Sequence, residues 1–129
     1  MIVNKLSNHE WTNVIHFTTG GDYAHYGNRV PAVWVNNRGF FQISSAVSGS
    51  KDYWKKFKFS LGRQYNITIQ QYKQNGKYWF EITIDGSSIV NVENTKPTNF
   101  SNVKLYTSDP WYPPFTSDFG TISHLKIEK

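Results

Sequence analysis

Hydrophobic and polar residues alternate along most of the chain in short runs that Gly, Asn, Asp or Pro interrupt. The clearest run covers residues 77–84, where Tyr78, Phe80, Ile82 and Ile84 fall on one face and polar or amphipathic residues fall on the other. A period of two predicts a half-buried β-strand, and no stretch shows the spacing of an amphipathic helix. Asp85-Gly86 follows this run as a two-residue hairpin signal.

The same alternation predicts other short strands at residues 14–18, 32–35, 40–47, 56–61, 65–70, 88–92, 103–105 and 125–127. Asn75-Gly76 is a second hairpin signal, between the runs at 65–70 and 77–84. A single flat sheet would leave one apolar face in water, so this pattern predicts an all-β sandwich or a closed barrel. We expect residues 1–129 to form a single domain, because no linker or repeat divides them.

Composition narrows the class of protein. Aromatic residues make up 17% and charged residues 18% of the 129 positions, which excludes a disordered chain. The formal net charge is +5. There is no cysteine, and this excludes disulfides, thiolate metal sites and cysteine nucleophiles. No apolar run approaches the roughly 18 residues that a membrane-spanning helix requires.

Two segments depart from the strand pattern, at residues 20–29 and 108–119. Both are long for connections, and both combine aromatic with acidic residues. Loops that a rigid β scaffold holds in place are frequent binding sites. We therefore expect any functional site to lie in these two loops.

Four pieces, in this order, resemble the concanavalin A-like lectin/glucanase superfamily, especially its laminin-G-like and galectin-like branches. They are residues 10–17, residues 59–69, the hairpin that ends in Ile84-Asp85-Gly86, and residues 120–127 as a closing strand that returns beside the first. The resemblance implies a two-sheet antiparallel jelly-roll sandwich. Two features depart from the family: no disulfide is available near the closing strand, and only residues 1–6 stand where a complete opening strand is usual. The domain could therefore lack part of its first strand, and an unpaired edge would favour a homodimer.

Catalysis is not expected. Some members of the superfamily are glucanases with alternating acids on one strand, and the nearest match here is Glu81-Ile82-Thr83-Ile84-Asp85. In a regular strand these two carboxylates lie about 13 Å apart, whereas paired catalytic carboxylates lie about 5 to 9.5 Å apart. The four histidines show no HExxH-like spacing. A diverged glycoside hydrolase remains the weaker alternative.

Calcium is a candidate cofactor, because laminin-G-like modules often bind one ion at the rim of the sandwich. Asp22 and Asp109, one in each loop, are the candidate ligands, with Asp118 as a third. The alternative is that these acids only stabilise turns, as the sequence Asp109-Pro110 suggests.

Sugar binding requires an aromatic ring for the C–H face of the sugar and planar polar groups for its hydroxyls. The two loops offer Tyr23, His25, Tyr26, Asn28, Arg29, Trp111 and Tyr112. The structural alternative stays open at this point: the aromatic residues would cap the core, and Arg29 would pair with an acid such as Asp109.

Four lysines gather among aromatic residues at positions 51, 55, 56 and 58. Such a patch can bind nucleic acid, but no nucleic-acid-binding motif accompanies it, so nucleic acid is not favoured. The same patch would attract anionic glycans, and lysines on an exposed strand also keep an edge soluble.

These observations together predict a non-catalytic recognition module, extracellular or on the cell surface. It would bind a glycan or a protein partner through loops 20–29 and 108–119. Two sequons, at Asn66 and Asn99, agree with a secreted protein. The main alternative is a structural or adhesive module that self-associates through an edge strand and takes no small ligand.

Overall fold

A computed structural model describes residues 1–116 and 119–122 of the chain. Within them the fold is all-β, as the alternation predicts. The ten strands are β1 (Ile2–Val3), β2 (Trp11–Thr18), β3 (Ala32–Asn36), β4 (Phe40–Val47), β5 (Ser50–Lys58), β6 (Ile67–Gln74), β7 (Lys77–Ile84), β8 (Ser87–Glu93), β9 (Lys104–Tyr106) and β10 (Gly120–Thr121). No helix capable of crossing a membrane is found in this part of the chain.

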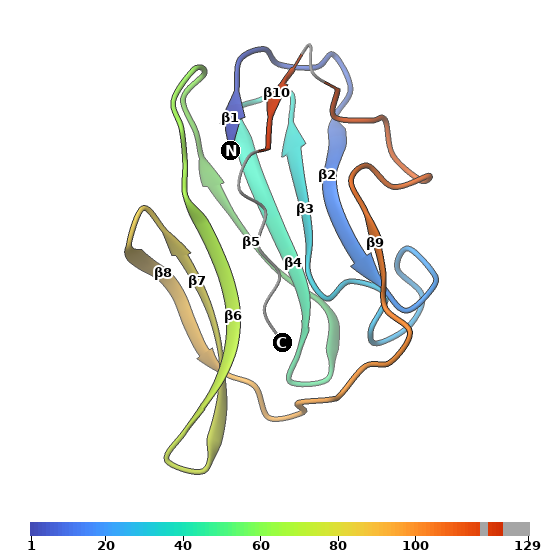
Figure 1. The fold of residues 1–129 in the computed structure, drawn as a ribbon, viewed down its shortest axis with the longest axis vertical. Coiled ribbons are helices and arrows are strands. Elements are labelled where there is room, and N and C mark those ends of the chain that lie inside the picture. The colour runs from blue at the N-terminus through green and yellow to red at the C-terminus, as the bar shows by residue number, and fades with distance from the viewer. Residues whose placement is uncertain (117–118, 123–129) are drawn as a thin grey trace.

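The strands form three antiparallel sheets (Figure 1). The largest has five strands in the order β5-β4-β3-β2-β9, and a second has three in the order β6-β7-β8. The third is the short pair β1-β10, in which Ile2 lies opposite Thr121. The beginning of the predicted closing strand therefore does return beside the first strand.

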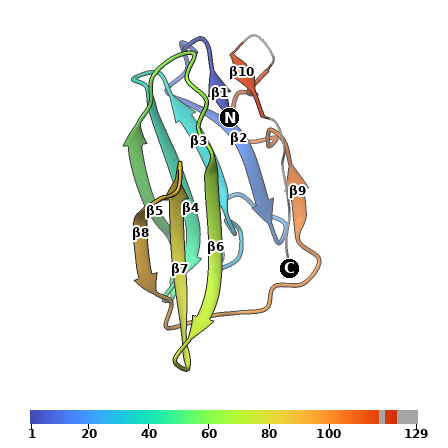
Figure 2. The ribbon, with the colours of Figure 1, turned by 60° about the vertical axis from the view of Figure 1, so that its left-hand side comes forward.

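One hydrophobic core joins the sheets. The three-stranded sheet lies against one side of the five-stranded sheet (Figure 2). The five-stranded sheet contributes Phe41 and Ile43, and the three-stranded sheet contributes Phe80 and Ile82. These side chains are almost completely buried, and the Tyr53 ring on β5 packs edge-on against Phe80 at 6.1 Å between centroids. Apolar alternation thus gives each sheet one face for the core and leaves the other face outward.

Tight two-residue turns connect the hairpins. Asn75-Gly76 and Asp85-Gly86 both have positive φ at each residue, as a type I′ turn requires, which confirms both hairpin predictions. Ser48-Gly49 makes the same turn between β4 and β5 with φ of 53° and 86°. The sequence analysis did not predict this turn, because Ser-Gly is a weaker signal than Asn-Gly or Asp-Gly.

Most predicted strands are confirmed with small shifts of their ends, and the clearest difference is at β5. The alternation predicted a strand at 56–61, whereas β5 begins at Ser50 and ends at Lys58. Phe59 stays in the core, but Leu61 is 52% exposed. The prediction that Leu61 shares the buried face is therefore wrong, since the chain turns after Ser60. The predicted strand at 125–127 lies outside the described residues.

The jelly-roll topology and the single domain over residues 1–129 stay predictions, as does a homodimer through an edge strand. Among the described strands, β5 and β9 are the edges of the five-stranded sheet, and β6 and β8 are the edges of the three-stranded sheet.

Candidate functional site

The two loops meet on a buried histidine that the sequence analysis did not single out. His16 lies on β2 and is completely buried. Its Nε2 lies 2.6 Å from the Asn28 carbonyl oxygen, and its Nδ1 lies 2.6 Å from Asp109 Oδ2. A carbonyl only accepts, so Nε2 carries a proton and donates it to Asn28. Through these two contacts His16 ties both loops to the sheet.

Asp109 organises the start of the second loop. Its other carboxylate oxygen, Oδ1, accepts hydrogen bonds of 3.0 Å from the backbone N–H groups of both Trp111 and Tyr112. Its own backbone N–H donates to Asn13 Oδ1 at 2.9 Å. Asp109 is only 4% exposed. Its carboxylate therefore serves the fold of the loop, as the turn alternative proposed.

Arg29 is the centre of a second buried network. Its guanidinium donates to Asp52 Oδ1 at 2.9 Å, to the Asp22 carbonyl at 3.0 Å, and to Asp22 Oδ1 and Tyr112 Oη at 3.2 Å each. The Trp34 ring lies 4.5 Å from the same guanidinium. Arg29 does form the internal ion pair that the sequence left open, but its partners are Asp22 and Asp52. The suggested partner, Asp109, pairs with His16 instead.

The electrostatics of this network follow from its burial. Burial lowers the pKa of Arg29, and the hydrogen bonds and charges of Asp52 and Asp22 more than offset it, so the net pKa is raised. Burial and the Asp22 charge raise the pKa of Tyr112, and they outweigh the opposing effect of Arg29. Both side chains therefore stay protonated at neutral pH.

The other predicted ligand residues differ in how free they are. Asn28 is buried, and its side chain accepts from the His25 backbone N–H and donates to Thr19 Oγ1. Tyr23 is 48% exposed, with Arg29 at 4.9 Å and Lys51 at 4.2 Å from its ring centroid. Cations therefore already contact the Tyr23 ring.

Trp111 and His25 reach the surface. Trp111 is 40% exposed and packs edge-on against His16 and Tyr106, with centroids 5.5 and 5.7 Å away. His25 is exposed. These two remain available to a partner, whereas the hydrogen-bonding groups of Asn28 are largely engaged inside the protein.

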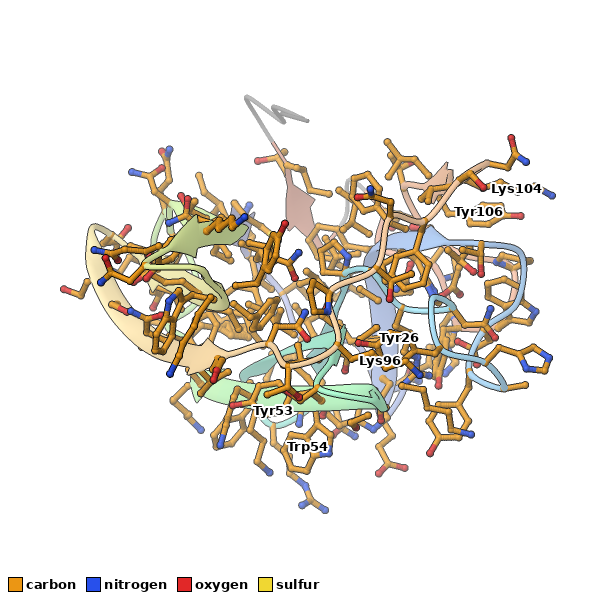
Figure 3. The ribbon with its side chains drawn as sticks, turned by 90° about the horizontal axis from the view of Figure 1, so that it is seen from below. Tyr26, Tyr53, Trp54, Lys96, Lys104 and Tyr106 are labelled. Atoms are coloured by element: carbon orange, nitrogen blue, oxygen red, sulfur yellow. The ribbon has the colours of Figure 1, made fainter. Side chains whose placement is uncertain are left out.

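Tyr26 fastens the first loop to the segment that follows β8. Figure 3 shows Tyr26 and Lys96 side by side: the Tyr26 hydroxyl donates to the Lys96 carbonyl at 2.8 Å, and Lys96 Nζ lies 4.8 Å from the Tyr26 ring. The ring also packs against Phe100. Gly27 has φ of +109°, and a Cβ there would lie 2.7 Å from the Phe100 ring, so this close approach requires glycine.

Three side chains are close enough together to be considered as ligands of one metal ion. One ligand atom from each of His16, Asp22 and Asp109 lies within 4.8 Å of the other two. The loops therefore do bring the two candidate calcium ligands together. Calcium takes six to eight oxygen ligands, and here the Asp109 oxygens and Asp22 Oδ1 already accept hydrogen bonds. A buried guanidinium also lies against Asp22. The donor set fits a closed ion-pair network better than a calcium ion.

A pocket opens beside these networks, on the outward face of the five-stranded sheet. Val33 and Val35 on β3 face the core, so Trp34 between them faces outward, and Gln42 on β4 lies directly opposite it in register. The pocket is small and open to solvent, and it is lined by Trp11, Arg29, Trp34, Gln42 and Tyr112. Three adjacent strands and both loops therefore contribute one lining residue each.

Three pocket residues, Trp11, Trp34 and Gln42, were not among the predicted ligand residues. Alternation places Gln42 opposite the buried Phe41 and Ile43, so it was identifiable as an outward residue. What the sequence does not reveal is that Gln42 lies beside Trp34, because cross-strand register depends on the turns.

The acids of the hydrolase alternative are held in local contacts. Glu81 accepts from Gln70 and Ser88 at 2.8 Å each. Asp85 accepts from Arg63 at 3.1 Å and from the Asn66 backbone N–H at 2.9 Å. Both carboxylates thus stabilise the three-stranded sheet and its hairpin.

Comparisons with protein-family models, with curated proteins and with solved structures found no match to this chain.

Proposed function

We propose that this chain is a non-catalytic carbohydrate-recognition module that binds a sugar in the pocket between Trp11 and Tyr112. The observation that carries the proposal is the composition of that pocket: three aromatic side chains, an amide and a guanidinium, from three adjacent strands and both loops. Small-molecule sites combine apolar and aromatic walls with a few placed polar groups in the same way.

Each wall has a separate part in this function. The Trp11 ring stacks on the C–H face of a sugar ring, and Gln42 and Tyr112 hydrogen-bond its hydroxyls. The pocket is small and open to solvent, so it would contact part of one sugar ring rather than enclose a ligand. The loops 20–29 and 108–119 thus act mainly by shaping the pocket. Tyr23 and Trp111 are exposed near it.

The fold and the location belong to the same proposal. We place the domain among jelly-roll sandwiches of the concanavalin A-like type, supported by a five-stranded and a three-stranded antiparallel sheet that share one core. An extracellular or cell-surface location is supported by two sequons whose asparagines, Asn66 and Asn99, are both exposed. An experimental structure tests the first part, and localisation of the full-length parent protein tests the second.

The binding proposal is tested by screening the chain on a glycan array and then measuring the best ligand by calorimetry. Trp11→Ala is expected to weaken binding at least tenfold with little change in Tm. Trp54→Ala is the matched control, because Trp54 is 48% exposed on the same outward face but does not line the pocket (Figure 3). Absence of any glycan ligand, or equal losses in the two variants, would contradict the proposal.

A further inference from the structure

The edge strand β5 and the turn before β4 carry most of the positive charge of the chain. Positions 36–58 contain five cationic residues and a single acid, Asp52, and the formal net charge of all 129 residues is +5. Asp52 is already paired with the buried Arg29 at 2.9 Å. One of the cations, Lys51, lies 4.2 Å from the centroid of the Tyr23 ring. The other four cations therefore have no free acid within their own segment.

These four residues form what we call the β5 basic surface: Arg38, Lys55, Lys56 and Lys58. All four are exposed, and none has a carboxylate within ion-pair distance in residues 1–116 and 119–122. Lys56 and Lys58 alternate on the outward face of β5, and the Lys58 ammonium donates to the Arg38 carbonyl at 2.9 Å. Lys55 occupies the other face, but β5 is the edge of its sheet. The four charges therefore line one edge of the five-stranded sheet.

One aromatic ring holds two of these charges close together. The ammonium groups of Lys56 and Lys58 lie 5.1 and 4.9 Å from the centroid of the Phe40 ring. The two ammonium groups are therefore no more than about 10 Å apart, which is about one Debye length at 0.1 M salt. Charges of one sign at this distance repel each other. An anionic chain that contacts both ammonium groups relieves that repulsion.

Lysines on an edge strand also prevent aggregation, but that role does not require charges of one sign. The three-stranded sheet, residues 67–93, has β6 and β8 as its edges among the described strands. It contains two lysines and three acids, so its charges are mixed. The single sign of charge on β5 is therefore a separate feature, and it is complementary to a partner with closely spaced negative charges.

We infer that the β5 basic surface binds a sulfated polysaccharide. Sulfate groups give a sugar chain closely spaced negative charges, and lysine ammonium groups contact such charges as point charges without any stacking of rings. A nucleic acid is the weaker match, because its bases stack on a series of exposed rings. Two lysines cover Phe40, and Trp54, which is 48% exposed, is one ring rather than a series (Figure 3). None of the four basic residues lines the pocket, so this inference does not depend on the proposed function.

The test measures the affinity for heparin, a sulfated polysaccharide, by calorimetry at low and at physiological salt. We expect binding that weakens as salt rises. The double variant Lys56→Gln/Lys58→Gln should weaken binding about tenfold or more and reduce its salt dependence. Lys56→Arg/Lys58→Arg keeps both charges and should retain the affinity. The matched control is Lys73→Gln/Lys77→Gln, which changes the net charge equally on the three-stranded sheet and should have less than about a twofold effect.

Three outcomes would overturn the inference. They are no heparin binding at physiological salt, equal losses in the two glutamine double variants, and tighter binding of single-stranded DNA than of heparin under the same conditions. Lys56→Gln/Lys58→Gln should leave the affinity for a neutral glycan in the pocket unchanged. The β5 basic surface and the pocket can therefore fail their tests separately.

Discussion

The two networks at the ends of the loops differ from the neighbouring pocket in how their polar groups are paired. Around His16 and Asp109, both ring nitrogens and both carboxylate oxygens have partners inside the protein. In the pocket, Trp34 Nε1–H has none among the described residues. Both regions are rich in aromatic and polar side chains, but His16 and Asp109 are buried, whereas Trp11, Gln42 and Tyr112 are only half-buried.

This difference assigns the two regions different roles. A fully paired buried network has no capacity left for a ligand, and its value is to hold the loops in one conformation. In the pocket, by contrast, Trp11, Gln42 and Tyr112 are only half-buried, so their rings and polar groups stay open to a ligand. Asp109, which first attracts attention in the sequence as a ligand residue, therefore serves the fold, and in our proposal the recognition chemistry lies in the pocket beside it.

The largest effect is expected from breaking the paired region at Asp109. Asp109→Ala removes the partner of His16 and the acceptor of two backbone N–H groups. Loss of a buried pair costs about 3–5 kcal/mol, or on the order of 10 °C in Tm. Thermal and urea unfolding measure this loss. Asp109→Asn retains an oxygen acceptor and should cost less. Glu93→Ala is the surface control, because its ion pair with Lys77 is exposed and long, at 4.0 Å. Equal stability of Asp109→Ala and Glu93→Ala would contradict a structural role for Asp109.

Arg29→Lys should come next in size. Lysine keeps the positive charge but cannot hold Asp22, Asp52 and Tyr112 at once, because it lacks the planar fork of guanidinium. We expect a loss of roughly 2 kcal/mol by urea unfolding. Arg63→Lys is the matched control: its ion pair with Asp85 is mostly exposed, and exposed pairs contribute about 0–1 kcal/mol. If the two variants lose the same stability, the Arg29 network does not contribute as the structure indicates.

Alkaline pH tests the contribution of Tyr112, which belongs both to the Arg29 network and to the pocket. Its pKa is raised above the ordinary value of 10.0, so between 10.0 and the folded pKa only the unfolded chain loses this proton. The contribution of this raised pKa to the free energy of unfolding is complete below pH 10, and it declines as pH rises through that range. The stability difference between the wild type and Tyr112→Phe, of about 1 kcal/mol at pH 7, should therefore shrink above pH 10. Urea unfolding from pH 7 to 10.5 measures it, and a difference that grows instead would contradict this assignment.

The smallest expected effect is that of calcium. Since the Asp109 oxygens and Asp22 Oδ1 are engaged, millimolar calcium should change Tm by less than about 1 °C relative to the same sample with chelator. A rise of several degrees would mean that the ion binds the folded state and that the paired region opens to accept it.

The sequence predicted the elements of the fold better than the site. Period-two alternation gave β7 with both of its ends correct, because one face of that strand is apolar and the other is not. At β5 it failed, since lysines and aromatic residues continue through Ser60 while the backbone turns away. Alternation records which face a residue occupies, but it does not say whether the strand ends before or at the turn residues, here Leu61-Gly62.

For the candidate site, the sequence drew attention to two loops that the structure brings together, but it did not reveal the roles of their residues. Trp111, Tyr112 and Arg29 do lie near one another, as the composition of the loops suggested. The partner of His16 is 93 positions away in the chain, and the pocket joins Trp11 to Tyr112 across three strands. Such contacts depend on register and on loop closure, which a single sequence does not fix.

The most direct test of the account observes the indole N–H groups themselves. In a ¹H–¹⁵N spectrum, the five tryptophans give five indole signals, which single Trp→Phe variants assign. As the best glycan ligand from the array is added, we predict that the Trp11 signal moves, because the sugar stacks on that ring, and that the Trp54 signal stays in place. A Trp11 signal that does not move while the ligand binds, or a shift centred on Trp54, would contradict the central claim that this pocket is the binding site.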